Sequence, residues 1–173
     1  MGFEQPAGAN ITQVTTHYGP RSTNQKFGGA PSTKGMVREL VYVFDYNDLP
    51  NASSATNSSL EQVIPAYAKV LSAKLEILVG FTSTSALTDL TVGLEKSSDR
   101  SVVDADGLIT AANATEAIIA TRGNYVVGTG ALVASNDVGA DAVEVVVAPS
   151  VDDLLTGKGR LIIEYIAEGP GGA

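Results

Sequence analysis

A chain of 173 residues can bury one hydrophobic core, but with no cysteine and a single histidine it lacks the residues for disulfides, thiolate metal sites and cysteine nucleophiles. Nineteen acidic residues against eleven basic ones give a formal net charge of −8, which opposes binding to nucleic acid or anionic lipid. The first residues do not resemble a secretory signal, and no apolar run approaches the roughly 20 residues of a membrane helix. We therefore expect a protein made in a cytoplasm, with neither nucleic acid nor membrane as a partner.

Residues 1 to 35 differ in composition from the rest of the chain. They are rich in Gly, Pro, Ser, Thr and Asn, and their isolated apolar residues are too few to form a core of their own. Residues 1 to 38 hold four basic residues against one acid, a net charge of +3, which leaves −11 for residues 39 to 173. This pattern predicts an extended arm that docks on a neighbouring subunit and orders on assembly; the alternative is a disordered tail. The candidate contact residues of the arm are Phe3, Ile11, Val14, Tyr18, Arg21, Lys26, Phe27 and Lys34.

A predicted strand over residues 36 to 46 is apolar on both faces. Its sequence, MVRELVYVFDY, places β-branched and aromatic residues at both odd and even positions. We therefore expect it to be covered on both sides, in the interior of the domain or in a subunit contact. Residues 47 to 59 are small, polar and turn-rich, and are expected to form a surface loop. The two faces of the strand are Leu40, Tyr42, Phe44 and Tyr46 on one side and Val37, Val41 and Val43 on the other.

The clearest strand pattern runs from residue 64 to residue 81. From Leu71 onward every second residue is apolar and mostly polar side chains fall between, which is the period of two of a half-buried strand. Pro65 lies at the entrance, where a missing N–H removes no ladder hydrogen bond. We predict that this stretch is the central strand of an antiparallel sheet. Residues 90 to 94 alternate in the same way and are predicted to form a hairpin with it.

The pattern is weaker in the middle of the chain. Residues 96 to 107 indicate a polar connection, and residues 108 to 120 indicate one or two short helical turns. A further strand is expected over residues 124 to 135. Within it, Gly128 and Gly130 predict a bulge or a close approach of two backbones.

Two more strands are predicted over residues 142 to 148 and 159 to 167. The loop expected between them covers residues 149 to 158 and turns at the Gly-Lys-Gly sequence of residues 157 to 159. Six or seven short strands with little helix are typical of an antiparallel β-sandwich.

The predicted organisation has three parts. An extended arm covers residues 1 to 35, a β-sandwich domain covers residues 36 to 168, and a flexible tail covers residues 169 to 173. The sandwich is the part expected to hold the hydrophobic core.

Few residues carry the chemistry of a catalytic or metal site. His17 lies in the arm, where a general base would be poorly positioned, so we expect no enzyme activity and no cofactor. Asp104 and Asp106 supply only the first two ligands of an EF-hand-like loop, and Asp152 and Asp153 form a second acidic pair. Polar loop residues are the simpler interpretation of both pairs, and no metal site is predicted.

A family resemblance rests on residues 60 to 112. This region contains IPAYAKVLSAKLEILVGF, then LTVGLEKSS and VVDADGLITA. These phrases resemble a group of small head proteins of tailed bacteriophages, in which an Ile-Pro-Ala lead-in precedes a similar strand and an Asp-Gly-Leu loop follows.

The resemblance implies a capsid decoration, or cement, protein with a jelly-roll-like β-sandwich. Such a protein would be a homotrimer on the exterior of the virion, where it would stabilise the shell by bridging subunits of the major capsid protein. The family carries no catalytic residues. Two alternatives stay open: a virion-borne β-sandwich that binds a host surface or glycan, and the capsid-anchoring part of a head fibre.

Overall fold

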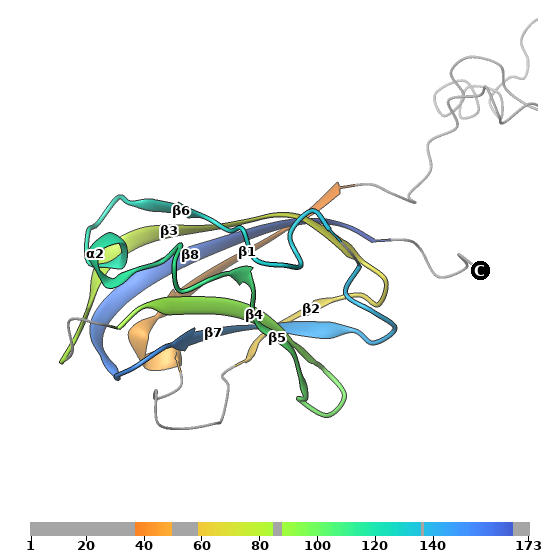
Figure 1. The fold of residues 1–173 in the computed structure, drawn as a ribbon, viewed down its shortest axis with the longest axis horizontal. Helices are drawn as coiled ribbons and strands as arrows, with labels where there is room; N and C mark the ends of the chain where they lie inside the picture. Colours follow the sequence, from red (N-terminus) through yellow and green to blue (C-terminus); the bar gives the residue numbers. More distant parts are fainter. Residues whose placement is uncertain (1–36, 50–58, 85–87, 136, 168–173) are drawn as a thin grey trace, which may run out of the picture. The chain divides into compact units, whose positions relative to one another are not determined.

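The computed structural model describes residues 37–49, 59–84, 88–135 and 137–167, which form two antiparallel β-sheets around a common core. The two layers are seen in Figure 1. The all-β, antiparallel sandwich predicted from the sequence is confirmed. Its elements are β1 (Val37–Asp45), the 3₁₀ helix η1 (Tyr46–Asp48), β2 (Ser59–Ile64), β3 (Lys69–Ser83), β4 (Leu90–Lys96), β5 (Val102–Ile109), α2 (Glu116–Ile119), β6 (Tyr125–Val127), β7 (Val143–Pro149) and β8 (Leu154–Ile166).

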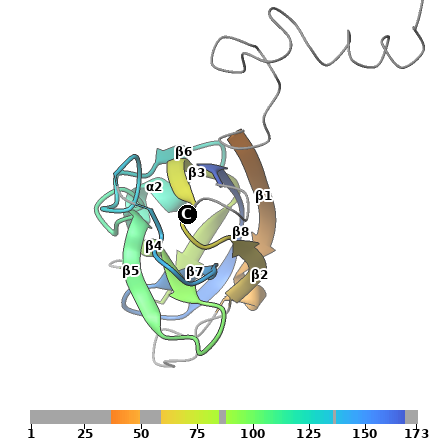
Figure 2. The ribbon, with the colours of Figure 1, turned by 90° about the vertical axis from the view of Figure 1, so that its right-hand side faces the viewer.

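Each sheet has four strands. Sheet A has the order β1-β8-β3-β6, and sheet B has the order β2-β7-β4-β5. Figure 2 shows the same two layers turned by 90°, with β1 at one side of the sandwich. Because β3 lies between β8 and β6, the prediction of a central strand is confirmed.

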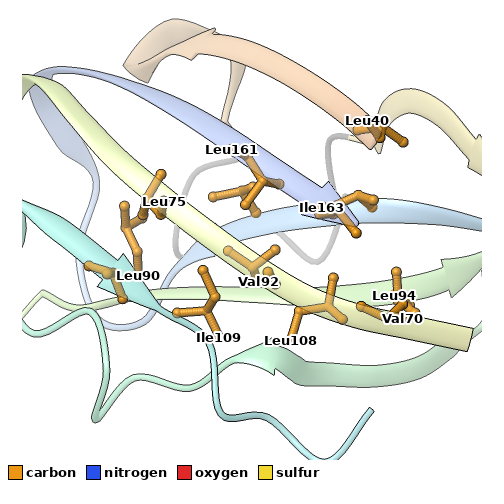
Figure 3. Close-up of a cluster of buried hydrophobic side chains, with 14 of the residues drawn as sticks. Leu40, Val70, Leu75, Leu90, Val92, Leu94, Leu108, Ile109, Leu161 and Ile163 are labelled. Atoms are coloured by element: carbon orange, nitrogen blue, oxygen red, sulfur yellow. The ribbon is translucent and has the colours of Figure 1, made fainter. Parts of the chain in front are cut away.

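Aliphatic side chains from both sheets fill the space between them. Leu75, Leu161 and Ile163 of sheet A face Val92 and Ile109 of sheet B, as Figure 3 shows, and all five are fully buried. Strands with β-branched and leucine side chains on one face bury that face against a second sheet. The sandwich is therefore held together by a continuous apolar layer.

The alternation predicted for β3 holds over most of the strand but fails at two points. The register with β8 shifts between Val70 and Ser72, so Leu71 is the extra residue of a bulge and is only half-buried. A second shift follows Ile77, and Val79 is 49% exposed. A further shift follows Val79, and Phe81 is buried again. A strict period of two cannot anticipate such shifts, because each one reverses the faces until the next.

The predicted hairpin between the strand of residues 64 to 81 and residues 90 to 94 is wrong. β3 belongs to sheet A, whereas β4 pairs with β7 and β5 in sheet B. The chain between β3 and β4 therefore crosses from one layer to the other. Alternation identifies both strands, but it does not specify which strands pair.

The stretch that begins at residue 64 is two strands rather than one. β2 ends at Ile64, and a turn at Pro65 to Ala68 leads into β3, with Ala68 N donating to Pro65 O at 3.1 Å. Tyr67 in this turn has φ 57°. Pro65 therefore separates β2 from β3. The loop expected over residues 47 to 59 lies mostly outside the described residues; at its two ends, residues 47 and 48 belong to η1 and residue 59 belongs to β2.

The loop predicted over residues 149 to 158 is shorter than expected, because β7 extends to Pro149 and β8 begins at Leu154. Gly157 and Gly159 are not turn residues but lie inside β8, under two aromatic rings. A Cβ built on Gly157 would lie 1.9 Å from Phe81 Cδ1, and one built on Gly159 would lie 2.7 Å from Phe44 Cζ. These glycines make room for rings that stack with their centroids 6.0 Å apart.

Between β4 and β7 the structure differs again from the expected connection. Residues 102 to 109 form β5 rather than a polar loop, and one helical turn, α2, accounts for the expected helix. The strand expected over residues 124 to 135 is reduced to the three residues of β6. The close backbone approach predicted at Gly128 is confirmed, since a Cβ there would lie 2.2 Å from the carbonyl oxygen of Leu108.

Candidate interaction surfaces

All the predicted contact residues of the arm lie outside the described residues, as does His17. The structure therefore places neither the arm nor the histidine. The eight arm residues concerned are Phe3, Ile11, Val14, Tyr18, Arg21, Lys26, Phe27 and Lys34.

The acidic pairs singled out in the sequence lie apart from each other. Asp104 and Asp106 belong to β5, where Asp106 N donates to Asp104 Oδ1 at 3.3 Å, and Asp152 accepts a hydrogen bond from the Thr84 hydroxyl. Within the described ranges no group of three or more His, Asp or Glu side chains could hold a metal ion. Nor does that part of the chain contain a helix long and apolar enough to cross a membrane.

The outer face of edge strand β1 carries three exposed valines. Val37, Val41 and Val43 point away from the core and are 57%, 48% and 47% exposed, whereas Leu40 and Phe44 are buried on the other face. The prediction that β1 is covered on both sides is therefore wrong for the sandwich itself. The other alternative, that this strand takes part in a subunit contact, is not tested by the structure.

The register extends this surface across sheet A. Val41 lies opposite Ile162 of β8, which lies opposite Lys74 of β3, and Lys74 lies opposite Val127 of β6. The outer face of sheet A thus carries charged side chains on its two central strands and valines on its edge strands. Exposed valines stand on both of its edges, because Val127 is 55% exposed.

Ion pairs occupy the middle of this face. Glu164 accepts a hydrogen bond from the Ser72 hydroxyl at 2.5 Å and lies 3.7 Å from Lys74 Nζ. These two partners lower the pKa of Glu164 from its ordinary value, the Ser72 hydrogen bond having the larger effect. Arg160 Nε donates to Glu76 Oε2 at 2.8 Å. The two central strands are therefore joined by charge as well as by backbone hydrogen bonds.

Sheet B carries a more buried charge cluster. Glu95 of β4 lies directly opposite Glu144 of β7, and their side chains are 1% and 13% exposed. Arg100, in the turn between β4 and β5, lies between them, with Nη1 3.4 Å from Glu95 and Nη2 3.5 Å from Glu144. Two like charges facing each other across a ladder repel, so the guanidinium offsets a repulsion that the fold creates.

A small cavity of about 50 Å³ adjoins this cluster. That volume can hold a few water molecules but not an organic ligand of ordinary size. Its lining includes no aromatic side chain, so it lacks the stacking platform of a sugar-binding groove. The lining residues are Thr91, Leu94, Glu95, Val102, Ala105, Val146 and Ala148.

The Arg100 cluster leaves no recognisable pattern in the sequence, because its two acidic partners are 49 residues apart. The exposure of the β1 valines was also not predicted. The sequence does contain a signal for an exposed apolar surface there, since both faces of the strand are apolar. The pattern does not indicate which face lies outward.

No family model matches the chain, and no curated protein matches it. Among solved structures, a chain in the capsid of Ralstonia phage GP4 is similar with a TM-score of 0.54 and 19% sequence identity, covering 80% of this chain and 89% of that one. A chain in the capsid asymmetric unit of cyanophage Pam1 gives a TM-score of 0.48 at 18% identity, covering 84% and 96% of the two chains. The first similarity shows a shared fold, and the second is too low to support an inference.

Proposed function

We propose that this protein is a structural component of a phage virion, a decoration protein that binds the outside of the capsid and bridges subunits of the major capsid protein. The observation that carries the proposal is the fold shared with a chain of the Ralstonia phage GP4 capsid, over most of both chains. The sequence phrases of residues 60 to 112 point in the same direction.

The distribution of surface features supports a binding role. The described residues present exposed valines and ion pairs on the outer face of sheet A. Many copies on a shell multiply a modest affinity per copy, so a surface of scattered contacts is sufficient for stable decoration.

In this proposal the protein forms a homotrimer, and its basic arm makes the contact with neighbouring subunits. The arm carries a net positive charge and the body a net negative one, which favours docking of the arm on another copy or on the capsid. Its apolar residues, spaced along an extended segment, would fill separate small depressions and order on contact.

Deletion of residues 1 to 35 tests the role of the arm. We expect a large fall in occupancy on capsids stripped of this protein, measured by quantitative gel analysis of sedimented particles. Deletion of residues 169 to 173 is the matched control and should leave occupancy unchanged. Equal occupancy of the arm deletion and the full chain would contradict the arm contact.

A particle reconstruction by electron microscopy tests the function itself. Density for the sandwich should cover junctions between major capsid protein subunits on the outer surface, in groups of three. Density confined to a fibre base or to the tail would refute the decoration role, and retention of the free protein on a glycan array would favour the host-binding alternative.

A further inference from the structure

Strand β1 presents an open edge of sheet A. Among the described strands it pairs only with β8, in an uninterrupted register of nine residue pairs. Natural edge strands are protected by lysine, proline, bulges or short length. β1 has no lysine, proline or register shift and is nine residues long. Charged side chains also protect an edge, but in β1 they lie towards its two ends, at Arg38, Glu39 and Asp45, and residues 40 to 44, LVYVF, contain none.

The other edges of the two sheets are less suited to accept a strand. β6, at the opposite edge of sheet A, is three residues long. β2 and β5, the edges of sheet B, both contain register shifts against their partners. A regular nine-residue edge flanked by exposed valines is therefore found at β1 within the described part of the chain.

The arm contains one segment with the composition of a strand. Residues 11 to 18, ITQVTTHY, include six β-branched or aromatic residues out of eight. The segment contains no Gly, Pro, Asp, Glu, Lys or Arg. Asn10 precedes the segment, and Gly19 and Pro20 follow it, as turn residues bound a strand. An isolated strand has no stability in water, so such a segment requires an existing sheet edge.

We propose that residues 11 to 18 of one copy add as a strand to the open edge of β1 in a neighbouring copy. This mode of association supplies backbone hydrogen bonds along the edge, and the β-branched side chains of the added strand pack beside Val41 and Val43. This inference rests on the arm contact of the proposed function, for which it names the donor segment and the strand that receives it.

The length of the intervening chain favours a neighbouring copy over the same copy. Residues 19 to 36 would form an internal loop of 18 residues, longer than the roughly 12 to 15 that compact domains ordinarily contain. Fully extended at about 3.3 Å per residue, the same 18 residues reach about 60 Å, enough to span to an adjacent subunit. Arg21, Lys26 and Lys34 within this linker are attracted to the acidic body of that subunit.

Exchange of this segment is heterologous, because the donor and the acceptor are different surfaces. Heterologous contacts close into rings when the rotation between subunits allows it, which is compatible with three copies. Each copy would give one strand and receive one, so no β1 edge in the ring would stay open.

Disulfide trapping on the free protein tests the pairing. Because the chain has no cysteine, an introduced thiol is unique. One copy carries Val41→Cys. A second copy carries a single cysteine at position 12, 13, 14, 15 or 16 and a tag that makes it longer, so that the two copies differ in size. The two copies are co-expressed and oxidised.

A covalent product between the two copies is expected at one or two arm positions of the same parity, since a disulfide requires Cα atoms about 4.4 to 6.8 Å apart and side chains alternate along a strand. Val127→Cys, equally exposed on the opposite edge of sheet A, is the matched control and should give no product. The absence of a product at every position, or equal products at positions of both parities, would overturn the proposal.

Substitutions that block a strand give an independent measurement. Val14→Pro and Val41→Lys should each weaken self-association by about tenfold or more in sedimentation, which corresponds to about 1.4 kcal/mol. Ser22→Pro in the linker and Val127→Lys are the matched controls and should change it less than about twofold. Unchanged association of Val14→Pro and Val41→Lys would refute strand addition, whereas capsid binding measured separately would still decide the decoration role.

Discussion

Replacing Gly157 by alanine is expected to destabilise the sandwich more than the same substitution at Gly139 or Gly159. Gly157 has φ 135°, and an added Cβ would lie 1.9 Å from Cδ1 and 2.4 Å from Cγ of Phe81. Backbone strain at such a φ costs about 1–3 kcal/mol. Overpacking of a buried ring costs about 1–3 kcal/mol more, so the sum is about 2–6 kcal/mol.

Two matched substitutions separate these two costs. Gly139 has φ 93°, but a Cβ there meets nothing within 4 Å, so Gly139→Ala should show the strain alone, about 1–3 kcal/mol. A Cβ on Gly159 meets the far end of the Phe44 ring at 2.7 Å, and no unusual φ accompanies it, so Gly159→Ala should show packing alone, about 1–3 kcal/mol.

The assay is urea unfolding of each variant, followed by far-UV circular dichroism, with the free energy of unfolding taken from the linear extrapolation. A double-mutant cycle with Phe81→Leu isolates the ring contact, because removing the ring should recover part of the loss in Gly157→Ala and none of the loss in Gly139→Ala. Equal destabilisation by Gly157→Ala and Gly139→Ala, with no coupling to Phe81, would refute the packing argument.

Two further predictions concern charge. Arg100→Gln should lower the free energy of unfolding by about 1–2 kcal/mol in urea, less than the roughly 3–5 kcal/mol of a fully buried pair, because Arg100 is 55% exposed. Adding Glu144→Gln should restore part of the loss, because it removes one of the two facing carboxylates. An absence of coupling between the two substitutions would contradict the cluster. Ser72→Ala should raise the pKa of Glu164, measured by NMR titration of its side-chain carboxyl carbon. Since the folded-state pKa of Glu164 is lowered, its contribution to stability is present above the unfolded-state pKa and is lost as the pH falls through the folded-state value, and an unchanged titration curve in Ser72→Ala would show that the hydroxyl is not the cause.

Local pattern predicted the strands of this protein better than their partners. Alternation in β3 and β4 was sufficient to identify each one, because burial of one face leaves a period of two in the sequence. The predicted hairpin failed because the connection from Ser83 to Leu90 passes between layers, and the choice of layer depends on the whole core. Pairing is a property of the fold and leaves little trace in any one segment.

Glycine caused the clearest misinterpretation. The sequence Gly-Lys-Gly at residues 157 to 159 predicted a turn, since glycine adopts turn conformations readily. In the structure the absence of a side chain serves packing, because Phe81 and Phe44 from other strands of the sheet cross directly over these positions. The two aromatic residues are 76 and 115 residues away from their glycines along the chain, so no local rule could have connected them.

Of the candidate surfaces, the β1 face could be partly predicted from the sequence and the Arg100 cluster could not. That β1 is apolar on both faces was visible in the sequence, and it led to two alternatives, interior or subunit contact. The structure removes the first for the sandwich itself, because Val41 and Val43 are about half exposed on an edge. The buried carboxylates of Glu95 and Glu144 could not be anticipated, because their proximity follows from the register of β4 with β7.

The position of β8 has a consequence for synthesis of the protein. β8 runs between β1 and β3. Ile166 pairs with Val37 of β1, and every β8 residue that pairs with β3 is more than 70 residues away from its partner along the chain. Sheet A therefore cannot close on the ribosome before residue 166 has emerged, and until then β1 and β3 lack their shared partner. Such long-range pairing is slow and leaves nascent edges exposed to other chains, so rapid synthesis of many copies places these molecules at risk of aggregation in the interval before β8 arrives.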